Sequence, residues 1–173
     1  MPLAISCSAV ERGAKSDAVS NLFDEGERAS FERRIDEWLA TVHQSHPNTV
    51  SAGRAPNESD RWMVRLRGDV KEFTTIWLRL GQRTLHYETY VMPFPEENSA
   101  EVFEVLLRRN ERLVGAHYVL GAENAVFLTG QLVLAALTES ELDRIIGTLY
   151  ATVEAQFDEL VRRAFASRFS SAQ

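Results

Sequence analysis

Histidines and one nearby glutamate are the residues of this 173-residue chain that could most readily support metal or acid–base chemistry. His43 and His46 have a spacing that, on a helix, could present two imidazoles to one metal ion. No third ligand is identifiable, and histidines are also favoured near a helix C-terminus by the helix dipole. His86, Glu88 and His117 could converge if their strands were neighbours. Polar positions on an exposed sheet face explain them as well, so we expect no metal and no other cofactor.

No signature of a catalytic centre occurs elsewhere in the sequence. There is no glycine-rich phosphate loop, no G-x-S-x-G and no paired CxxC. Cys7 is the single cysteine, so an internal disulfide cannot form. We therefore expect a protein that is not an enzyme.

Three arginines are candidates for recognition. Arg65, Arg67 and Arg79 alternate along two neighbouring predicted strands. Their forked guanidinium groups could hold an anion or an acidic peptide. Cross-strand pairing with Glu88 and nearby acids is the alternative, and it is the interpretation we favour.

Helical periodicity predicts three helices around these residues. The first runs from Ser30 and stops before Pro47, because a residue preceding proline is disfavoured in the helical region. The second follows the prolines after Met92, and the long third opens with a Thr138 capping box. Residues 47–60, rich in Pro, Gly, Asn and Ser, predict a surface loop.

Two-residue alternation predicts the strands. Three strand-like segments follow one another between Arg61 and Met92, and two more occupy Ala116–Leu120 and Ala125 to about Val133. The predicted fold is therefore α+β, a single antiparallel five-stranded sheet in the order α-β-β-β-α-β-β-α.

The side of this sheet that faces away from the helices is the main candidate for function. If the aliphatic residues face the helices, the opposite face carries Met63, Arg65, Arg67, Thr75, Trp77, Arg79, His86, Glu88, Tyr90 and Met92. A face with Trp77 and Tyr90 is more apolar than exposure to water requires. We expect a second subunit, a bound peptide or the chain's own N-terminal segment to cover it.

One polar residue has a predicted structural role. Asn110 lies on the apolar stripe of the second helix, where its amide must find hydrogen-bond partners. We expect it to bond backbone groups near Gly115.

Composition bounds the organisation of the chain and its partners. We expect a flexible segment over residues 1–25, one domain over 26–168 and a frayed end at 169–173. The net charge of −6 argues against a nucleic-acid partner. No apolar run is long enough to cross a membrane and no secretory signal is evident, so we expect a cytoplasmic protein.

The element order and three stretches of sequence carry a family resemblance. The stretches are MPFPEEN before the second helix, LLRRN at its end, and LDRIIGTLYATVEAQFDEL in the third. Over roughly residues 30–165 the chain resembles the bacterial YbjN family and its type III secretion chaperone-like relatives. The resemblance implies a compact α+β fold, frequent homodimerisation, and binding of segments of other proteins or a regulatory role.

Together these observations predict a non-enzymatic protein- or peptide-binding module, chaperone-like or regulatory, that acts as a homodimer. Its partners would be a second copy of itself and an unidentified protein segment, bound around Trp77 and Tyr90. The alternative is a small-molecule-binding protein or enzyme with a pocket between the sheet and the 47–60 loop. That alternative requires converging polar groups such as His86, Glu88 and His117.

Overall fold

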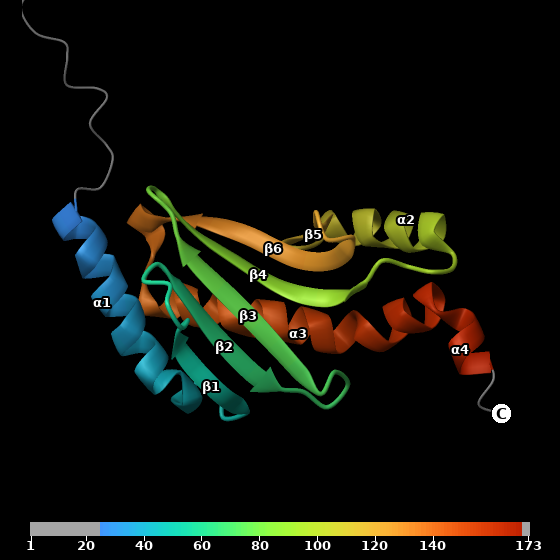
Figure 1. The fold of residues 1–173 in the computed structure, drawn as a ribbon, viewed down its shortest axis with the longest axis horizontal. Coiled ribbons are helices and arrows are strands. Elements are labelled where there is room, and N and C mark those ends of the chain that lie inside the picture. Colours follow the sequence, from blue (N-terminus) through green and yellow to red (C-terminus); the bar gives the residue numbers. More distant parts are fainter. Residues whose placement is uncertain (1–24, 171–173) are drawn as a thin grey trace, which may run out of the picture.

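The computed structural model describes residues 25–170, so Cys7 and nearly all of the segment expected to be flexible lie outside the described residues. The arrangement of the helices and strands is shown in Figure 1. The helical elements are α1 (Glu25–Thr41), η1 (Val42–Gln44), α2 (Ser99–Asn110), η2 (Leu134–Ala136), α3 (Glu139–Ala164) and α4 (Ala166–Ser170). The strands are β1 (Thr49–Arg54), β2 (Arg61–Arg67), β3 (Phe73–Leu80), β4 (Thr84–Pro93), β5 (His117–Leu120) and β6 (Ala125–Val133).

All strands described belong to one antiparallel sheet in the order β1-β2-β3-β4-β6-β5. The long α3 passes behind the sheet, α1 crosses it at the β1 end, and α2 lies beside β5 (Figure 1). The α+β prediction is thus confirmed, with one layer of helices against one sheet.

The sheet has six strands, so the predicted number of five is wrong. The additional strand, β1, lies within residues 47–60, which the sequence predicts to be a loop. Four of its six positions are exposed, two are half-buried and none is buried. A strand with both faces largely open to water lacks the apolar alternation that reveals strands in a sequence, and β1 is held by backbone pairing with β2.

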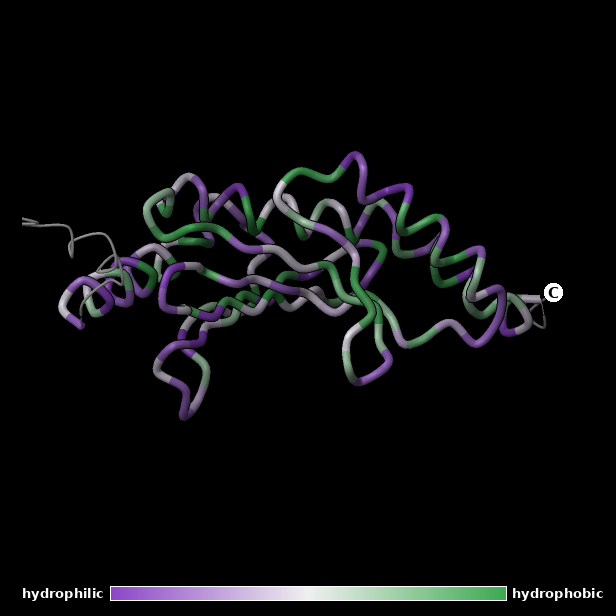
Figure 2. Tube along the Cα trace, turned by 90° about the horizontal axis from the view of Figure 1, so that it is seen from above, coloured by the Kyte–Doolittle hydropathy of each residue, from purple (hydrophilic) through white to green (hydrophobic). Residues whose placement is uncertain are grey.

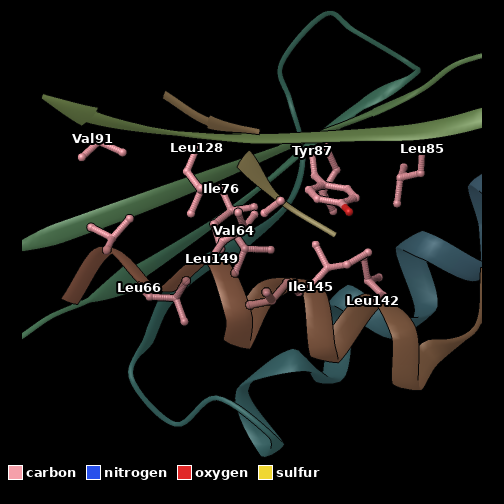
Figure 3. Close-up of a cluster of buried hydrophobic side chains, with 14 of the residues drawn as sticks. Val64, Leu66, Ile76, Leu85, Tyr87, Val91, Leu128, Leu142, Ile145 and Leu149 are labelled. Atoms are coloured by element: carbon pink, nitrogen blue, oxygen red, sulfur yellow. The ribbon is translucent and has the colours of Figure 1, made fainter. Parts of the chain in front are cut away.

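The core lies between the inner face of the sheet and α1 and α3. Figure 3 shows the strand side chains pointing toward Leu142, Ile145 and Leu149 of α3. Along β2 and β3, buried positions alternate with exposed or half-buried ones, and hydrophobic and hydrophilic residues are mixed along the chain (Figure 2). The fully buried strand residues include Trp62, Val64, Leu66, Ile76, Leu78, Leu85 and Leu128. This alternation assigns the intervening side chains to the opposite, outer face.

Two polar contacts fix the helices to this core. The Thr138 hydroxyl accepts a hydrogen bond of 3.2 Å from the Glu141 amide, as the predicted cap of α3 requires. On α1, Asp36 accepts a 2.7 Å hydrogen bond from the indole of Trp62, which is fully buried on β2. The first helix and the sheet are therefore joined by a specific hydrogen bond in addition to apolar packing.

No helix among residues 25–170 is both long and apolar enough to span a membrane.

Candidate protein-binding surface

The outer face of the sheet is the surface opposite the core. Cross-strand pairing aligns Met63, Trp77 and Glu88 in one row and extends it through Thr129 to His117. The side chains that form this outer face are Arg61, Met63, Arg65, Arg67, Phe73, Thr75, Trp77, Arg79, His86, Glu88, Tyr90, Phe127, Thr129 and Gln131, and each is exposed or half-buried. Nine of the ten residues predicted for this face are among them.

Met92 is the exception, and its predicted place on the outer face is wrong. The pairing of β4 with β6 shifts between Tyr90 and Met92, which marks a bulge. Because a bulge reverses the in–out alternation, Met92 turns inward and is only 1% exposed. Tyr90, just before the shift, is 42% exposed.

Aromatic rings on the outer face are stacked with cations. The guanidinium of Arg61 lies 4.2 Å from the ring centroid of Trp77, and that of Arg65 lies 4.1 Å from Phe73. Tyr90 packs edge-to-face on Phe127 with a centroid separation of 5.7 Å. Such contacts partly shield the rings while leaving amphipathic surface of the kind that is enriched at protein interfaces.

A hollow of about 440 Å³ lies in the outer face beside Trp77. Its lining includes Arg61, Arg79, His86 and Glu88. Pairing places Arg61 opposite Arg79 and Arg79 opposite His86, so three basic residues form a row across β2, β3 and β4. The lining of the hollow thus combines the Trp77 ring with the basic row and the carboxylate of Glu88.

One carboxylate bridges two members of this row. Glu58, in the turn between β1 and β2, lies 3.1 Å from Arg61 and 3.1 Å from Arg79, one oxygen to each. Among residues 25–170, neither Arg65 nor Arg67 has a carboxylate within ion-pair distance, and Glu88 pairs with none of the arginines. The three arginines therefore do not pair with Glu88, and of the three Arg79 pairs with another nearby acid, Glu58.

A second, apolar hollow of about 340 Å³ lies between β4 and the C-terminal helices. Phe157, Phe165 and Phe169 line it, and Lys71 reaches it from the β2–β3 turn. The Lys71 ammonium donates hydrogen bonds to the carbonyls of Tyr90 and Val91. Burial lowers the pKa of Lys71 to about 8, against a smaller opposing effect of Glu154.

The structure does not bring the histidines into a metal site. His117 pairs with Thr129, which pairs with Glu88, so a whole strand, roughly 10 Å across two strand spacings, separates His117 from Glu88. His46 lies 3.0 Å from Asp143 of α3, an ion pair when the imidazole is protonated. Across residues 25–170, no three His, Cys, Asp or Glu side chains are grouped to hold a metal ion.

Asn110 fills the structural role predicted for it. Its amide donates to the Tyr118 carbonyl at 3.2 Å, and its carbonyl oxygen accepts from the Tyr118 amide at 2.7 Å. Tyr118 follows Gly115, whose φ of +76° turns the chain into β5. The end of α2 is thereby joined to the edge strand β5.

The pocket predicted between the sheet and the 47–60 loop does not gather the polar groups that a small-molecule site would need. A hollow of about 490 Å³ beside this segment is lined by Pro47–Val50, Arg67, Asp69 and Tyr150. His86 and Glu88 instead line the hollow beside Trp77, and His117 lines neither. His86, Glu88 and His117 therefore do not converge at one site.

Sequence reasoning missed several residues of the outer face. Phe127 lies in a segment correctly predicted as a strand, but its face could be assigned only by knowing that β6 pairs with β4. Glu58 lies in the turn and has no periodic signal at all. Arg61 precedes Trp62 directly, and alternation could have placed it on the face of Met63.

Comparison with solved structures identifies the fold. The ExsC–ExsE complex matches with a TM-score of 0.55 and 17% identity over 77% of this chain and 95% of that chain. The heterodimeric ExoU–SpcU complex from the type III secretion system of Pseudomonas aeruginosa matches with a TM-score of 0.52 and 13% identity, over 73% and 96%. The fold is that of the type III secretion chaperone-like proteins.

The sequence assigns the family within this class. A model of the YbjN family, described as "Putative bacterial sensory transduction regulator", matches residues 32–162, and the chain belongs to this family. The uncharacterised protein Rv0487 of Mycobacterium tuberculosis is 34% identical over 138 residues, 80% of this chain and 74% of its own length. The uncharacterised protein ML2442 of Mycobacterium leprae is 32% identical over 126 residues, 73% of this chain and 68% of its own length.

Proposed function

We propose that this protein is a non-enzymatic protein-binding module, chaperone-like or regulatory, that works in the cytoplasm as a homodimer. Its outer face, centred on Trp77 and Tyr90, would engage a segment of a partner protein. The edge strand β1, which has no buried residue, would offer backbone groups to which such a segment could add as a further strand.

The observation that carries this proposal is the aromatic surface on the side of the sheet without helices. Trp77, Tyr90, Phe127 and Phe73 all lie there, and none is fully buried. Burial of such rings contributes strongly to association, because each combines a large apolar area with few rotatable bonds. A face bearing only charged groups would give a partner little to bind.

The fold supports the same conclusion. The two similar structures are complexes in which a protein of this fold is bound to a partner protein. In the described part of this chain, the hollows hold no grouped metal ligands. Binding of protein is therefore the function that the geometry favours.

Replacing Trp77 and Tyr90 with alanine tests the proposal. We expect the double variant to lose most capture of partner proteins from an extract of the source cell, because two ring contacts at an interface centre are removed. Phe94→Ala is the matched control, since Phe94 is 40% exposed, close to the 42% of Tyr90, and packs on Phe103 of α2. The control should retain every partner.

Light scattering on the same proteins addresses the homodimer. If two copies associate through the outer face, the double variant should have half the wild-type mass while Phe94→Ala keeps the full mass. An unchanged mass together with an unchanged set of captured partners would contradict the proposed function.

A further inference from the structure

We propose that the basic row of Arg61, Arg79 and His86 binds a carboxylate side chain of the partner segment, and that Glu58 occupies this position in the free protein as an internal ligand. This inference rests on the proposed function and specifies the partner: an acidic segment with a large apolar residue next to its carboxylate.

The first argument is the local charge of the outer face. Arg61 and Arg79 are directly opposite each other on neighbouring strands, an arrangement that is unfavourable for like charges without an anion nearby. The chain carries a net charge of −6, yet this face carries Arg61, Arg65, Arg67 and Arg79. Concentration of arginine on one face of an acidic protein gives that face a charge complementary to an acidic segment.

The second argument is the position of Glu58. Its two carboxylate oxygens each contact one arginine at 3.1 Å, which is the geometry that a partner's aspartate or glutamate would adopt. Glu58 thus shows that a carboxylate fits between Arg61 and Arg79. It also means that a partner's carboxylate must displace it.

Displacement of Glu58 requires little energy. Side chains of Glu58 and Arg79 are 36% and 59% exposed, and ion pairs with that exposure contribute little. The turn that carries Glu58 is held by backbone hydrogen bonds from the Ala55 amide to the Arg61 carbonyl and from the Leu80 amide to the Asp60 carbonyl, both at 2.8 Å. The half-exposed side chain of Glu58 can rotate away from the two arginines while these backbone bonds stay in place.

The third observation is that the aromatic ring of Trp77 lies beside the basic row. Trp77 lines the same hollow as Arg61 and Arg79, and Arg61 stacks on its ring. The volume of about 440 Å³ leaves room for a large apolar side chain next to the bound carboxylate. Affinity would come from apolar burial, and selectivity from the charge.

The test begins with a phage-displayed library of random 12-residue peptides, selected on the full chain. We expect the selected peptides to be enriched in Asp or Glu beside an aliphatic or aromatic residue. A fluorescein-labelled selected peptide is then titrated by fluorescence anisotropy against the wild type, Glu58→Gln, and the double variant Arg61→Gln with Arg79→Gln.

Glu58→Gln should bind the peptide roughly two- to fivefold more tightly than the wild type, because an exposed competing ion pair is removed. The double arginine variant should bind roughly tenfold more weakly. Glu104→Gln is the control, because Glu104 also pairs with an arginine, Arg108, at an exposed position on α2, and it should bind like the wild type. Circular dichroism checks that all variants are folded.

Several results would overturn the inference: no selected peptide, selected peptides without excess acid, equal binding when their acids are changed to amides, or no gain from Glu58→Gln. Tighter arginine-dependent binding of a labelled single-stranded oligonucleotide would overturn it in favour of nucleic acid. If partner capture depends on Trp77 and Tyr90 but not on Arg61 and Arg79, the proposed function stands and this inference falls. If capture is independent of Trp77 and Tyr90, the proposed function itself falls.

Discussion

Asp36 illustrates, at the scale of single residues, how a charged group on a helix positions a strand of the binding surface. It accepts a hydrogen bond from the fully buried Trp62 and pairs with Arg54 of β1 at 2.5 Å. Partial burial raises the pKa of Asp36, but the hydrogen bonds from Arg54 and Trp62 outweigh it and leave the pKa below its usual value. The neighbours of Trp62 on β2, Arg61 and Met63, belong to the outer face, so this contact supports the surface from beneath.

Asp36→Ala should lower the free energy of unfolding by about 1–3 kcal/mol, because the buried indole N–H of Trp62 loses its acceptor. Asp36→Asn keeps an acceptor and should lose less. Because the folded-state pKa is depressed, the charge-dependent stabilisation is present above the unfolded pKa of about 3.9 and is lost as pH falls through the folded value. Urea unfolding at pH 7 and in steps below pH 4 should show the gap between wild type and Asp36→Asn closing. A gap that stays constant across this range would contradict the assigned role of the carboxylate.

The β2–β3 hairpin shows how an element is held in place at the next scale. Glu154 of α3 accepts hydrogen bonds from the backbone amides of Asp69, Val70 and Lys71 at 2.8, 2.9 and 3.1 Å. Gly68 allows this close approach, since a β-carbon there would lie 2.2 Å from a Glu154 oxygen. One carboxylate on the helix thus fixes the turn that connects two strands of the outer face.

Removing this anchor should destabilise the protein measurably. Glu154→Ala should lower the free energy of unfolding by about 1–3 kcal/mol, because three amides lose a charged acceptor. Asp158→Ala, which removes an exposed ion pair with Arg162 on the same helix, should change it by less than about 1 kcal/mol. Equal urea midpoints for the two variants would show that Glu154 does not hold the hairpin.

The helices and strands differ in how well they could be predicted from the sequence. Strands with one buried face, such as β2 and β3, can be predicted because apolar and polar residues alternate along them. The helices can be predicted because their apolar residues recur every three or four positions. β1 buries neither face and Met92 follows a bulge, so periodicity gives no signal for the one and a misleading signal for the other. The Glu58 contact depends on how a turn folds back across two strands, which no local pattern encodes.

On the scale of the whole molecule, the protein divides into a covered and an uncovered side. Helices α1 and α3 lie on one side of the sheet (Figure 1) and bury its aliphatic face. The remaining face combines aromatic rings with arginines. Proteins seldom expose such a surface over several strands unless something binds to it. We propose that another protein, either a partner or a second copy, covers Trp77 and Tyr90.

Hydroxyl-radical footprinting measures this coverage directly, because it reports the solvent accessibility of individual side chains. The complex recovered from the source cell is compared with the isolated chain at a dilution that leaves it monomeric, and oxidation rates are read by mass spectrometry. We predict that oxidation of Trp77 and Tyr90 slows severalfold in the complex while Phe94 is oxidised at the same rate in both. Equal rates for Trp77 and Tyr90 in the two samples would contradict it.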